Sequence, residues 1–241
     1  KNIIDAVHIL AGGVQALWRF GFSRPTVMLA AGSDVAVPAA WAAWLYGVPV
    51  CIHQLDVEPG LANKLIAPIA RKITVTFPDS AWAYPASRTV VTGSPVRAAF
   101  YHAPSVAEAR KQLGLNPNLP VVTVVGGGTG AEFFNALVSR TLDKLSQTMQ
   151  VLHVTGGDRT TSNLVNVHYR SYPFVIDSLP ILAAADLVVT RGGMAFISEL
   201  GALTKAAVVI PMPGTHQEVT AAYLERHKAA RVFQQNTLTD A

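Results

Sequence analysis

The segment VVTVVGGGTG, residues 121–130, carries the clearest structural signal in the sequence. Its five β-branched residues are typical of a buried strand, and the glycines after them predict a tight turn into a helix. A second segment of this kind, LVVTRGG, occupies residues 187–193. Units that run from a buried strand through a glycine turn into a helix predict an open parallel sheet with helices on both faces.

Strand-like and helix-like segments alternate on both sides of this stretch. Strands are expected at residues 26–30, 48–53, 72–77, 89–92, 121–125, 151–155, 174–176, 187–190, 206–211 and 231–233. Helices are expected at residues 37–46, 61–69, 105–113, 131–147, 179–184, 195–203 and 217–226, and an amphipathic one carries Ile3 to Leu17. Between residues 98 and 120 the pattern weakens and prolines accumulate, which indicates a domain boundary. The predicted fold class is therefore α/β, with two Rossmann-like, doubly wound domains, residues 1–100 and 101–241, facing a cleft.

Composition limits the class of protein. Half of the 241 residues are apolar and only 14% are charged, which excludes disordered, collagen-like and coiled-coil proteins. The formal charge of +4 is small and dispersed, so the sequence predicts no nucleic-acid partner. The uncharged run at residues 35–52 is interrupted by proline and glycine, which favours a buried core over a membrane span. The single cysteine, Cys51, forms no internal disulfide and fits a reduced cytoplasmic setting.

Both glycine turns are candidates for binding an anion. Glycine lets the backbone approach a ligand, its free N–H groups can bind a phosphate, and Thr129 adds a hydroxyl donor. Glu199 lies about one turn into the helix that follows the second glycine turn, and a carboxylate there can accept both hydroxyls of a ribose. The alternatives are a purely structural turn and, for Glu199, a solvated side chain.

Other polar residues at predicted strand ends are further candidates. Arg97 can pair with a phosphate through its planar guanidinium, or it is a surface charge. His216 and Gln217 either bind sugar hydroxyls or cap the helix that follows them. His53 is either a general base or a buried polar group, and the second interpretation is favoured. The histidines show no metal-ligand spacing and no nucleophile motif is present, so neither a metal nor a covalent intermediate is predicted.

In order along the chain, these segments resemble one family. The segments are His53-Gln54-Leu55-Asp56 with residues 59–64, residues 92–97, residues 126–131 with Asn135, residues 185–193 with Ser198-Glu199, and Pro211 with His216-Gln217. Together they resemble the MurG family, the bacterial N-acetylglucosaminyltransferases that complete lipid II. The resemblance implies a GT-B fold, with the acceptor bound by the first domain and UDP-N-acetylglucosamine mainly by the second. It implies inverting transfer to the 4-hydroxyl of the muramoyl group of undecaprenyl-linked lipid I, without a cofactor.

The resemblance also assigns residues. Arg97 and Thr129 would contact the diphosphate, Ile176 the uracil, and Gln217 with His216 the sugar. The segment that holds phosphate and ribose comprises Met194, Ala195, Phe196, Ile197, Ser198 and Glu199, the last on the ribose hydroxyls. His53, Asp56 and Asn63 would lie on the acceptor side. The family usually has His-Glu-Gln-Asn where this chain has His53-Gln54-Leu55-Asp56, so the usual Asn contact would fall to Asp56.

The family's N-terminal glycine-rich loop, with its histidine, has no counterpart in these residues. The catalytic base is therefore expected upstream of them, and the 241-residue chain is expected to bind donor weakly without turnover. The implied location is the cytoplasmic face of a bacterial plasma membrane, held peripherally. Aromatic, aliphatic and basic residues of the first domain would make that contact, namely Ile3, Val7, Leu10, Trp18, Arg19, Phe20, Phe22, Arg24 and Trp44. The alternative is that these faces, the aliphatic ones above all, belong to the buried core.

Two other functions fit the same residues. A diacylglycerol glycosyltransferase of the same superfamily would share the donor half and differ in the acceptor half. A nucleotide-sugar-binding protein without catalytic activity would keep the donor site alone.

Overall fold

The computed structural model describes residues 2–127, 131–156 and 166–238, which form two compact units, Lys1–Ser94 and Pro95–Ala241. The units divide after Ser94, whereas the sequence placed the boundary after residue 100. The difference arises because Phe100 is only 2% exposed and packs in the core of the second unit beside Leu115 and Leu182. Residues 95–100, including Arg97, therefore belong to the second unit.

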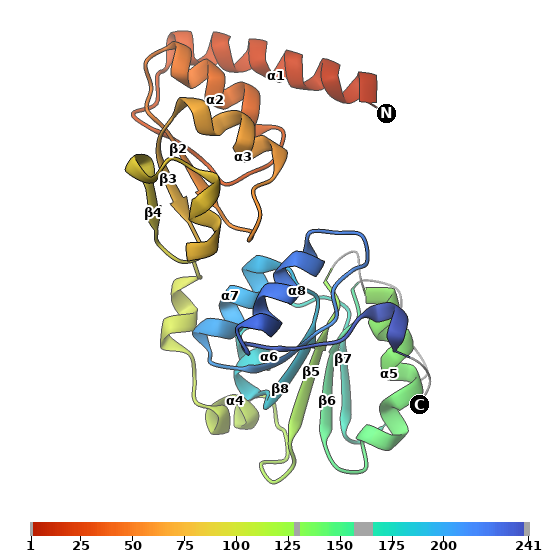
Figure 1. Cartoon of the computed structure of the whole chain (residues 1–241). Coiled ribbons are helices and arrows are strands. Elements are labelled where there is room, and N and C mark those ends of the chain that lie inside the picture. Colours follow the sequence, from red (N-terminus) through yellow and green to blue (C-terminus); the bar gives the residue numbers. More distant parts are fainter. Residues whose placement is uncertain (1, 128–130, 157–165, 239–241) are drawn as a thin grey trace. The chain divides into compact units, whose positions relative to one another are not determined.

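The first unit is built on a four-stranded parallel sheet in the order β1-β2-β3-β4 (Figure 1). Its strands are β1 (Met28–Ala30), β2 (Val50–Gln54), β3 (Ala70–Val75) and β4 (Thr89–Val91). Its helices are α1 (Asn2–Phe22), α2 (Ala36–Leu45) and α3 (Leu61–Ile66), with short 3-10 turns η1 (Ala67–Ile69), η2 (Pro78–Ala83) and η3 (Ala86–Arg88). Aliphatic residues of β2 and β3 pack against Ala40 and Ala43 of α2 and Ile66 of α3, while α1 packs on α2.

The second unit is a six-stranded parallel sheet in the order β10-β9-β8-β5-β6-β7. Its strands are β5 (Val121–Val125), β6 (Gln150–Val154), β7 (Tyr169–Tyr172), β8 (Leu187–Thr190), β9 (Ala206–Val209) and β10 (Arg231–Val232). Its helices are α4 (Val106–Gln112), α5 (Ala131–Leu145), α6 (Leu179–Ala184), α7 (Met194–Ala202) and α8 (Gln217–Arg226), with 3-10 turns η4 (Ala98–His102) and η5 (Gln235–Thr237).

The side chains of the central strand β5 explain why this sheet is covered on both faces. Val122 and Val124 pack with α5 on one face, whereas Val121 packs with α6 on the other. Thr123 faces α6 as well, and its hydroxyl donates to the carbonyl oxygen of Ile181 at 3.0 Å. A strand buried on both faces reads as a continuous apolar run, which is why residues 121–125 signalled the fold so clearly.

Two predicted elements are corrected. The strand predicted at residues 174–176 is absent, and the strand next to β6 is Tyr169–Tyr172 instead. Pro173, which has no N–H to donate to the ladder, follows β7 at once, and Ile176 is 90% exposed. The helix predicted at residues 61–69 ends at Ile66 and continues as a 3-10 turn, where Pro68 removes a donor.

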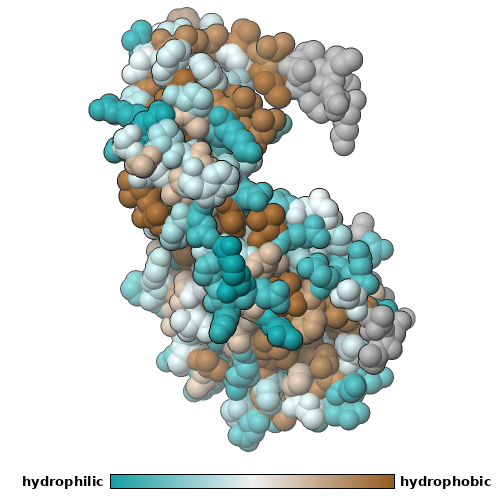
Figure 2. All heavy atoms as spheres, in the orientation of Figure 1, coloured by the Kyte–Doolittle hydropathy of each residue, from teal (hydrophilic) through white to brown (hydrophobic). Residues whose placement is uncertain are grey.

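The outer side of α1 exposes large apolar side chains, while its inner side packs on α2. Leu10 is 72%, Trp18 68% and Phe22 77% exposed, and hydrophobic atoms gather over this helix in Figure 2. Phe20, by contrast, packs against the core of the first unit. None of the described helices is both long and apolar enough to cross a membrane.

Candidate functional site

Two glycine turns of the second unit lie side by side at the carboxyl edge of its sheet. β5 pairs with β6 on one side and with β8 on the other, so the chain reverses its direction of winding between β5 and β8. Gly126 and Gly127 follow β5, and Gly192 and Gly193 follow β8. Gly127 has a φ of +70°, which only glycine adopts without strain. Ligands of open α/β sheets bind at such a reversal. Thr129, which the sequence predicted as a phosphate ligand in the first turn, lies outside the described residues.

A pocket of about 280 Å³ opens at this edge. Its walls are mainly apolar, with Phe174, Ile176 and Phe196 among the lining residues. Arg97 and Ser178 supply its polar side chains. A smaller pocket of about 160 Å³ adjoins it, shares Gly127 and Phe196, and is lined further by residues that include Gly193 and Gln217. The combination of apolar walls and a few converging polar groups is typical of a small-molecule site.

Arg97 and Glu199 meet beside the larger pocket, although they are far apart in the sequence. The Nε of Arg97 donates to Oε1 of Glu199 at 2.8 Å, and its Nη2 donates to the Ser178 hydroxyl, also at 2.8 Å. The guanidinium lies over the ring of Phe100, 4.8 Å from its centroid. The Glu199 side chain is 13% exposed and that of Arg97 is 49% exposed. The structure therefore brings together two residues that the sequence predicted for one ligand.

The predicted residues of α7 divide into groups with different surroundings. Met194 is buried, and its carbonyl oxygen accepts a hydrogen bond from the Ser198 hydroxyl at 2.8 Å. Ile197 packs against the core. Ala195 is exposed, and Phe196 lines both pockets. From this helix, the first-turn backbone N–H groups, Phe196 and Glu199 therefore remain as candidates for ligand contact.

Gln217 marks the far side of the smaller pocket. Its Oε1 accepts the backbone N–H of Met212 at 3.0 Å, and His216 is the residue that precedes α8. A Cβ built on Gly192 would lie 2.9 Å from the backbone oxygen of Gln217. Glycine is thus required at residue 192 because the backbone at the start of α8 passes directly against it.

Two residues near the pockets were not predicted as functional. Ser178 precedes α6 and holds Arg97, but no sequence pattern singled it out. Arg191, inside the glycine motif, is buried and donates to the carbonyl oxygens of Ile210 and Pro211 and to Oε1 of Gln235. Burial lowers the pKa of its guanidinium. Because Ile210 and Pro211 directly follow β9, these hydrogen bonds of Arg191 fix the chain at the end of that strand.

The acceptor-side candidates of the first unit lie in or next to a buried polar network. The His53 ring nitrogens lie 2.9 Å from the Thr74 hydroxyl and 3.4 Å from the Thr76 hydroxyl, and burial lowers the pKa of the imidazole. The structure thus agrees with the buried polar interpretation of His53. Gln54, which was not predicted, is the centre of the network: its Oε1 accepts from Asn63 at 2.7 Å and from Tyr84 at 2.8 Å.

This network fixes the loop after β2. The Nε2 of Gln54 donates to the carbonyl oxygens of Asp56 at 2.8 Å and of Glu58 at 2.9 Å. Asn63 is buried, and burial raises the pKa of Tyr84 to about 12. Asn63 therefore has a structural role in this unit, whereas Asp56, partly exposed, keeps its side chain near the surface.

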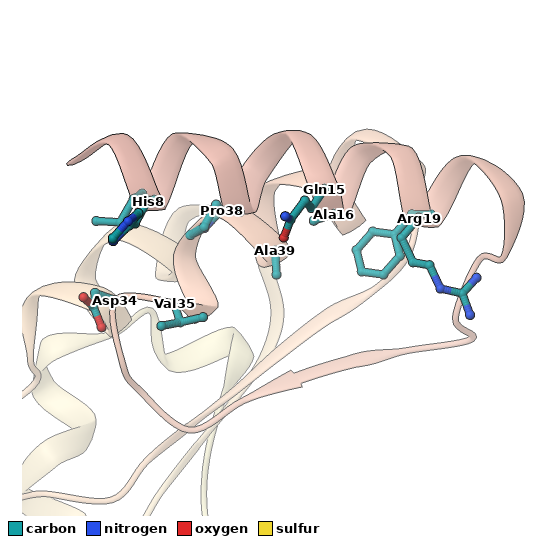
Figure 3. A pocket seen from close by; sticks show the side chains of 11 residues that line it. His8, Gln15, Ala16, Arg19, Asp34, Val35, Pro38 and Ala39 are labelled. Carbon is teal, nitrogen blue, oxygen red and sulfur yellow. The ribbon is translucent and has the colours of Figure 1, made fainter. Parts of the chain in front are cut away.

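A separate groove of about 520 Å³ runs between α1 and the start of α2 (Figure 3). Ala16, Pro38 and Ala39 lie along its middle, His8 and Asp34 lie toward one end, and Arg19 lies toward the other. Small residues on both helices leave this space open. Among the described residues, no cluster of three His, Cys, Asp or Glu side chains is arranged to hold a metal ion.

Comparison with known proteins places the chain in a family. Residues 121–241 match the Glycosyltransferase family 28 C-terminal domain. A UDP-N-acetylglucosamine–N-acetylmuramyl-(pentapeptide) pyrophosphoryl-undecaprenol N-acetylglucosamine transferase of Clostridium kluyveri is 31% identical over 245 residues, covering 99% of this chain and 69% of that protein. A transferase of the same name, numbered 3, from Bacillus thuringiensis is 36% identical over 214 residues, covering 88% and 60% respectively.

Solved structures agree with this result. The crystal structure of Acinetobacter baumannii MurG matches with a TM-score of 0.74 and 27% identity, over 96% of this chain and 66% of that one. The calicheamicin glycosyltransferase CalG4 matches with a TM-score of 0.70 at 14% identity, over 99% and 68%, which bears on the fold alone. The predicted α/β fold of GT-B type is confirmed, and the chain spans about two thirds of the length of these proteins. The chain belongs to the MurG family of N-acetylglucosamine transferases.

Proposed function

We propose that the protein transfers N-acetylglucosamine from UDP-N-acetylglucosamine to lipid I, with inversion at the anomeric carbon, to form lipid II. Membership of a family of N-acetylglucosamine transferases makes it a hexosyltransferase. The observation that carries the donor assignment is the pairing of Arg97 with Glu199 beside a pocket at the carboxyl edge of the sheet. Arg97, a cation suited to the diphosphate, and Glu199, a carboxylate suited to the ribose, are hydrogen-bonded to each other there.

The donor site is assigned as follows. The exposed side chains of Phe174 and Ile176 would pack on the uracil. The Glu199 carboxylate would accept hydrogen bonds from the ribose hydroxyls. The diphosphate would bind Arg97, the backbone N–H groups after β5 with Thr129, and the start of α7. These groups stabilise the negative charge that develops on UDP as the glycosidic bond breaks. Gln217, which lines the smaller pocket, and His216, which precedes it, would contact the sugar.

The first unit would bind the acceptor, with His53, Asp56 and Asn63 shaping that side. His53 is not assigned as the general base, because both ring nitrogens lie within hydrogen-bonding distance of threonine hydroxyls. Since lipid I carries a polyprenyl tail, we place the protein peripherally on the cytoplasmic face of a bacterial plasma membrane. Through lipid II it would act in cell-wall biogenesis, and so in cell shape and division.

Helix α1 is the proposed membrane contact. Leu10, Trp18 and Phe22 are exposed on one helix, with Arg19 and Arg24 nearby in the sequence. Apolar and aromatic side chains beside basic ones favour the headgroup region of an anionic bilayer. The groove under α1 is lined along its middle by Ala16, Pro38 and Ala39 together with the amide of Gln15, and its apolar part suits the start of a prenyl chain.

Calorimetry tests the donor site. Glu199→Ala should weaken UDP binding by about 1–3 kcal/mol, the range for hydrogen bonds to a charged group. Glu225→Ala removes an exposed carboxylate of α8 and should leave the affinity unchanged. Equal UDP affinity in the Glu199→Ala variant and the parent would overturn the donor assignment.

Flotation with liposomes tests the membrane contact. The parent chain should float with vesicles that contain anionic phospholipid at low salt, and Trp18→Ser should reduce the bound fraction. Trp82→Ser is the matched control, because Trp82 is 78% exposed but lies in η2 rather than on α1. If the parent chain stays in the unbound fraction at low salt, the proposed contact is wrong.

A further inference from the structure

Arg97 is held in one orientation from three directions. Its Nε donates to Glu199, its Nη2 donates to Ser178, and its flat face covers the buried ring of Phe100. These contacts fix both the position and the plane of the guanidinium, although its side chain is about half exposed. The Nη1 group forms no hydrogen bond with the described residues, so one edge of the guanidinium remains available to a ligand.

Glu199 is arranged in the complementary way. Its Oε1 accepts from Arg97, while Oε2 has no hydrogen bond within the described part of the chain. The side chain is 13% exposed, so the carboxylate lies largely in a protein environment. A carboxylate with one oxygen fixed by a hydrogen bond has few rotamers left, and its second oxygen therefore points in a defined direction.

We propose that Arg97 is a positioning residue for ribose recognition as well as a ligand of the phosphate. Through Nε it holds the Glu199 carboxylate so that Oε2 accepts a ribose hydroxyl, while Nη1 donates to the diphosphate. This inference rests on the proposed function, since it assumes a uridine nucleotide in the pocket. Arg97 would then couple the binding of the ribose to the binding of the diphosphate, which would otherwise be independent of each other.

The shape of the guanidinium makes this double role possible. Arginine offers several donors in one rigid plane, whereas lysine offers a single compact charge on a flexible chain. A lysine at residue 97 could bind either the phosphate or the Glu199 carboxylate. It would lose the hydrogen bond to Ser178 and the stacking on Phe100. The link between ribose and phosphate therefore requires arginine and not merely a positive charge.

A positioning role of Arg97 would affect ligands that carry no phosphate. Uridine carries no phosphate, so a residue that only binds phosphate does not affect its affinity. If Arg97 holds Glu199 in place, removing Arg97 weakens uridine binding too. 2′,3′-Dideoxyuridine lacks the 2′- and 3′-hydroxyls that Glu199 would bind, so its affinity should not change when Arg97 is removed.

The experiment compares the parent 241-residue chain with Arg97→Met, Arg97→Lys and Glu199→Gln, using calorimetry with UDP, uridine and 2′,3′-dideoxyuridine. Arg97→Met and Arg97→Lys should each weaken uridine binding about tenfold, the loss of one charge-assisted hydrogen bond. Both should leave 2′,3′-dideoxyuridine binding as in the parent chain. Glu199→Gln keeps an oxygen that can accept from Nε but places an amide N–H group where Oε2 would accept the ribose hydroxyl, so it should weaken uridine binding at least as much as either Arg97 variant.

Three results would overturn the inference. Uridine affinity that is unchanged in Arg97→Met, with UDP affinity reduced, would leave Arg97 as a phosphate ligand only. Tighter uridine binding in that variant would mean that Arg97 competes with the ribose for Glu199. A parent chain that binds neither UDP nor uridine would contradict the proposed function itself. Circular dichroism of each variant separates these results from unfolding, and Arg97→Lys gives a second reading if Arg97→Met does not fold.

Discussion

The buried side chain of His153 should make the second unit less stable in mild acid. It lies on β6, fully buried, with Nδ1 3.0 Å from the Tyr169 hydroxyl. Its Nε2 has no hydrogen bond within the described residues. Burial lowers the pKa of this imidazole from 6.5 to about 4. The folded unit therefore holds the neutral ring at a pH where the unfolded chain binds a proton.

The sign and the size of the effect follow from these two pKa values. Between pH 6.5 and pH 4 the unfolded chain binds more protons at this residue than the folded chain, so stability falls as the pH falls. The loss between pH 7.5 and pH 5 is about 2 kcal/mol, and it reaches about 3 kcal/mol below pH 4. His153→Phe keeps a ring of similar size without a titrating group and should lack this part of the pH dependence.

Urea unfolding at the two pH values measures the effect. All four tryptophans, Trp18, Trp41, Trp44 and Trp82, lie in the first unit, so their fluorescence reports that unit alone. The part of the circular dichroism transition without a fluorescence change belongs to the second unit. From pH 7.5 to pH 5 the parent should lose about 2 kcal/mol more than His153→Phe in that transition.

The control is an exposed histidine of the same unit, His102. His102→Phe should leave the pH dependence of the parent chain in place. Equal losses of stability in the parent and in His153→Phe would refute the reasoning, because His153 would then bind its proton alike in the folded and unfolded chain.

The structure supports three further predictions. Gly192→Ala should destabilise the second unit by about 1–3 kcal/mol and weaken UDP binding, since the new Cβ would meet the backbone of Gln217 at 2.9 Å; urea unfolding and calorimetry measure the two effects. Gln54→Leu should lower the free energy of unfolding of the first unit by about 2–4 kcal/mol, seen by tryptophan fluorescence, because it leaves several buried polar groups unpaired. Ser105→Ala should cost about 1 kcal/mol in the circular dichroism transition of the second unit, because the capping box at the start of α4 is lost.

The elements that the sequence predicted well are those with one dominant physical signal. Residues 121–125 are apolar because both faces of β5 are covered, and the observed strand has the predicted bounds. The glycine turns after β5 and β8 were found because close approach and positive φ leave few other residues possible. Both turns lie at the same edge of the sheet, as parallel strands require.

Other features depend on contacts between distant residues and left no local pattern. The strand at residues 169–172 lies at the edge of the sheet and is polar, so the sequence did not indicate it. The strand was predicted instead at the apolar residues after Pro173, which line a pocket. Ser178 and Gln54 became visible only through their partners, Arg97 in one case and the loop after β2 in the other. The role of a polar residue is decided by what surrounds it, and a single sequence does not contain that information.

The strand order of the six-stranded sheet bears on how the nascent chain folds. β5 is the first of these strands to be synthesised, yet it becomes a central one, with β6 and β7 added at one edge and β8 to β10 at the other. Its pairing with β8 joins Val122 to Leu187, a long loop closure that slows folding. While the chain emerges from the ribosome, one edge of β5 stays unpaired until β8 arrives. Because the two glycine turns come from β5 and β8, the pocket is completed late, and any ligand of this pocket would stabilise only chains that have passed this step.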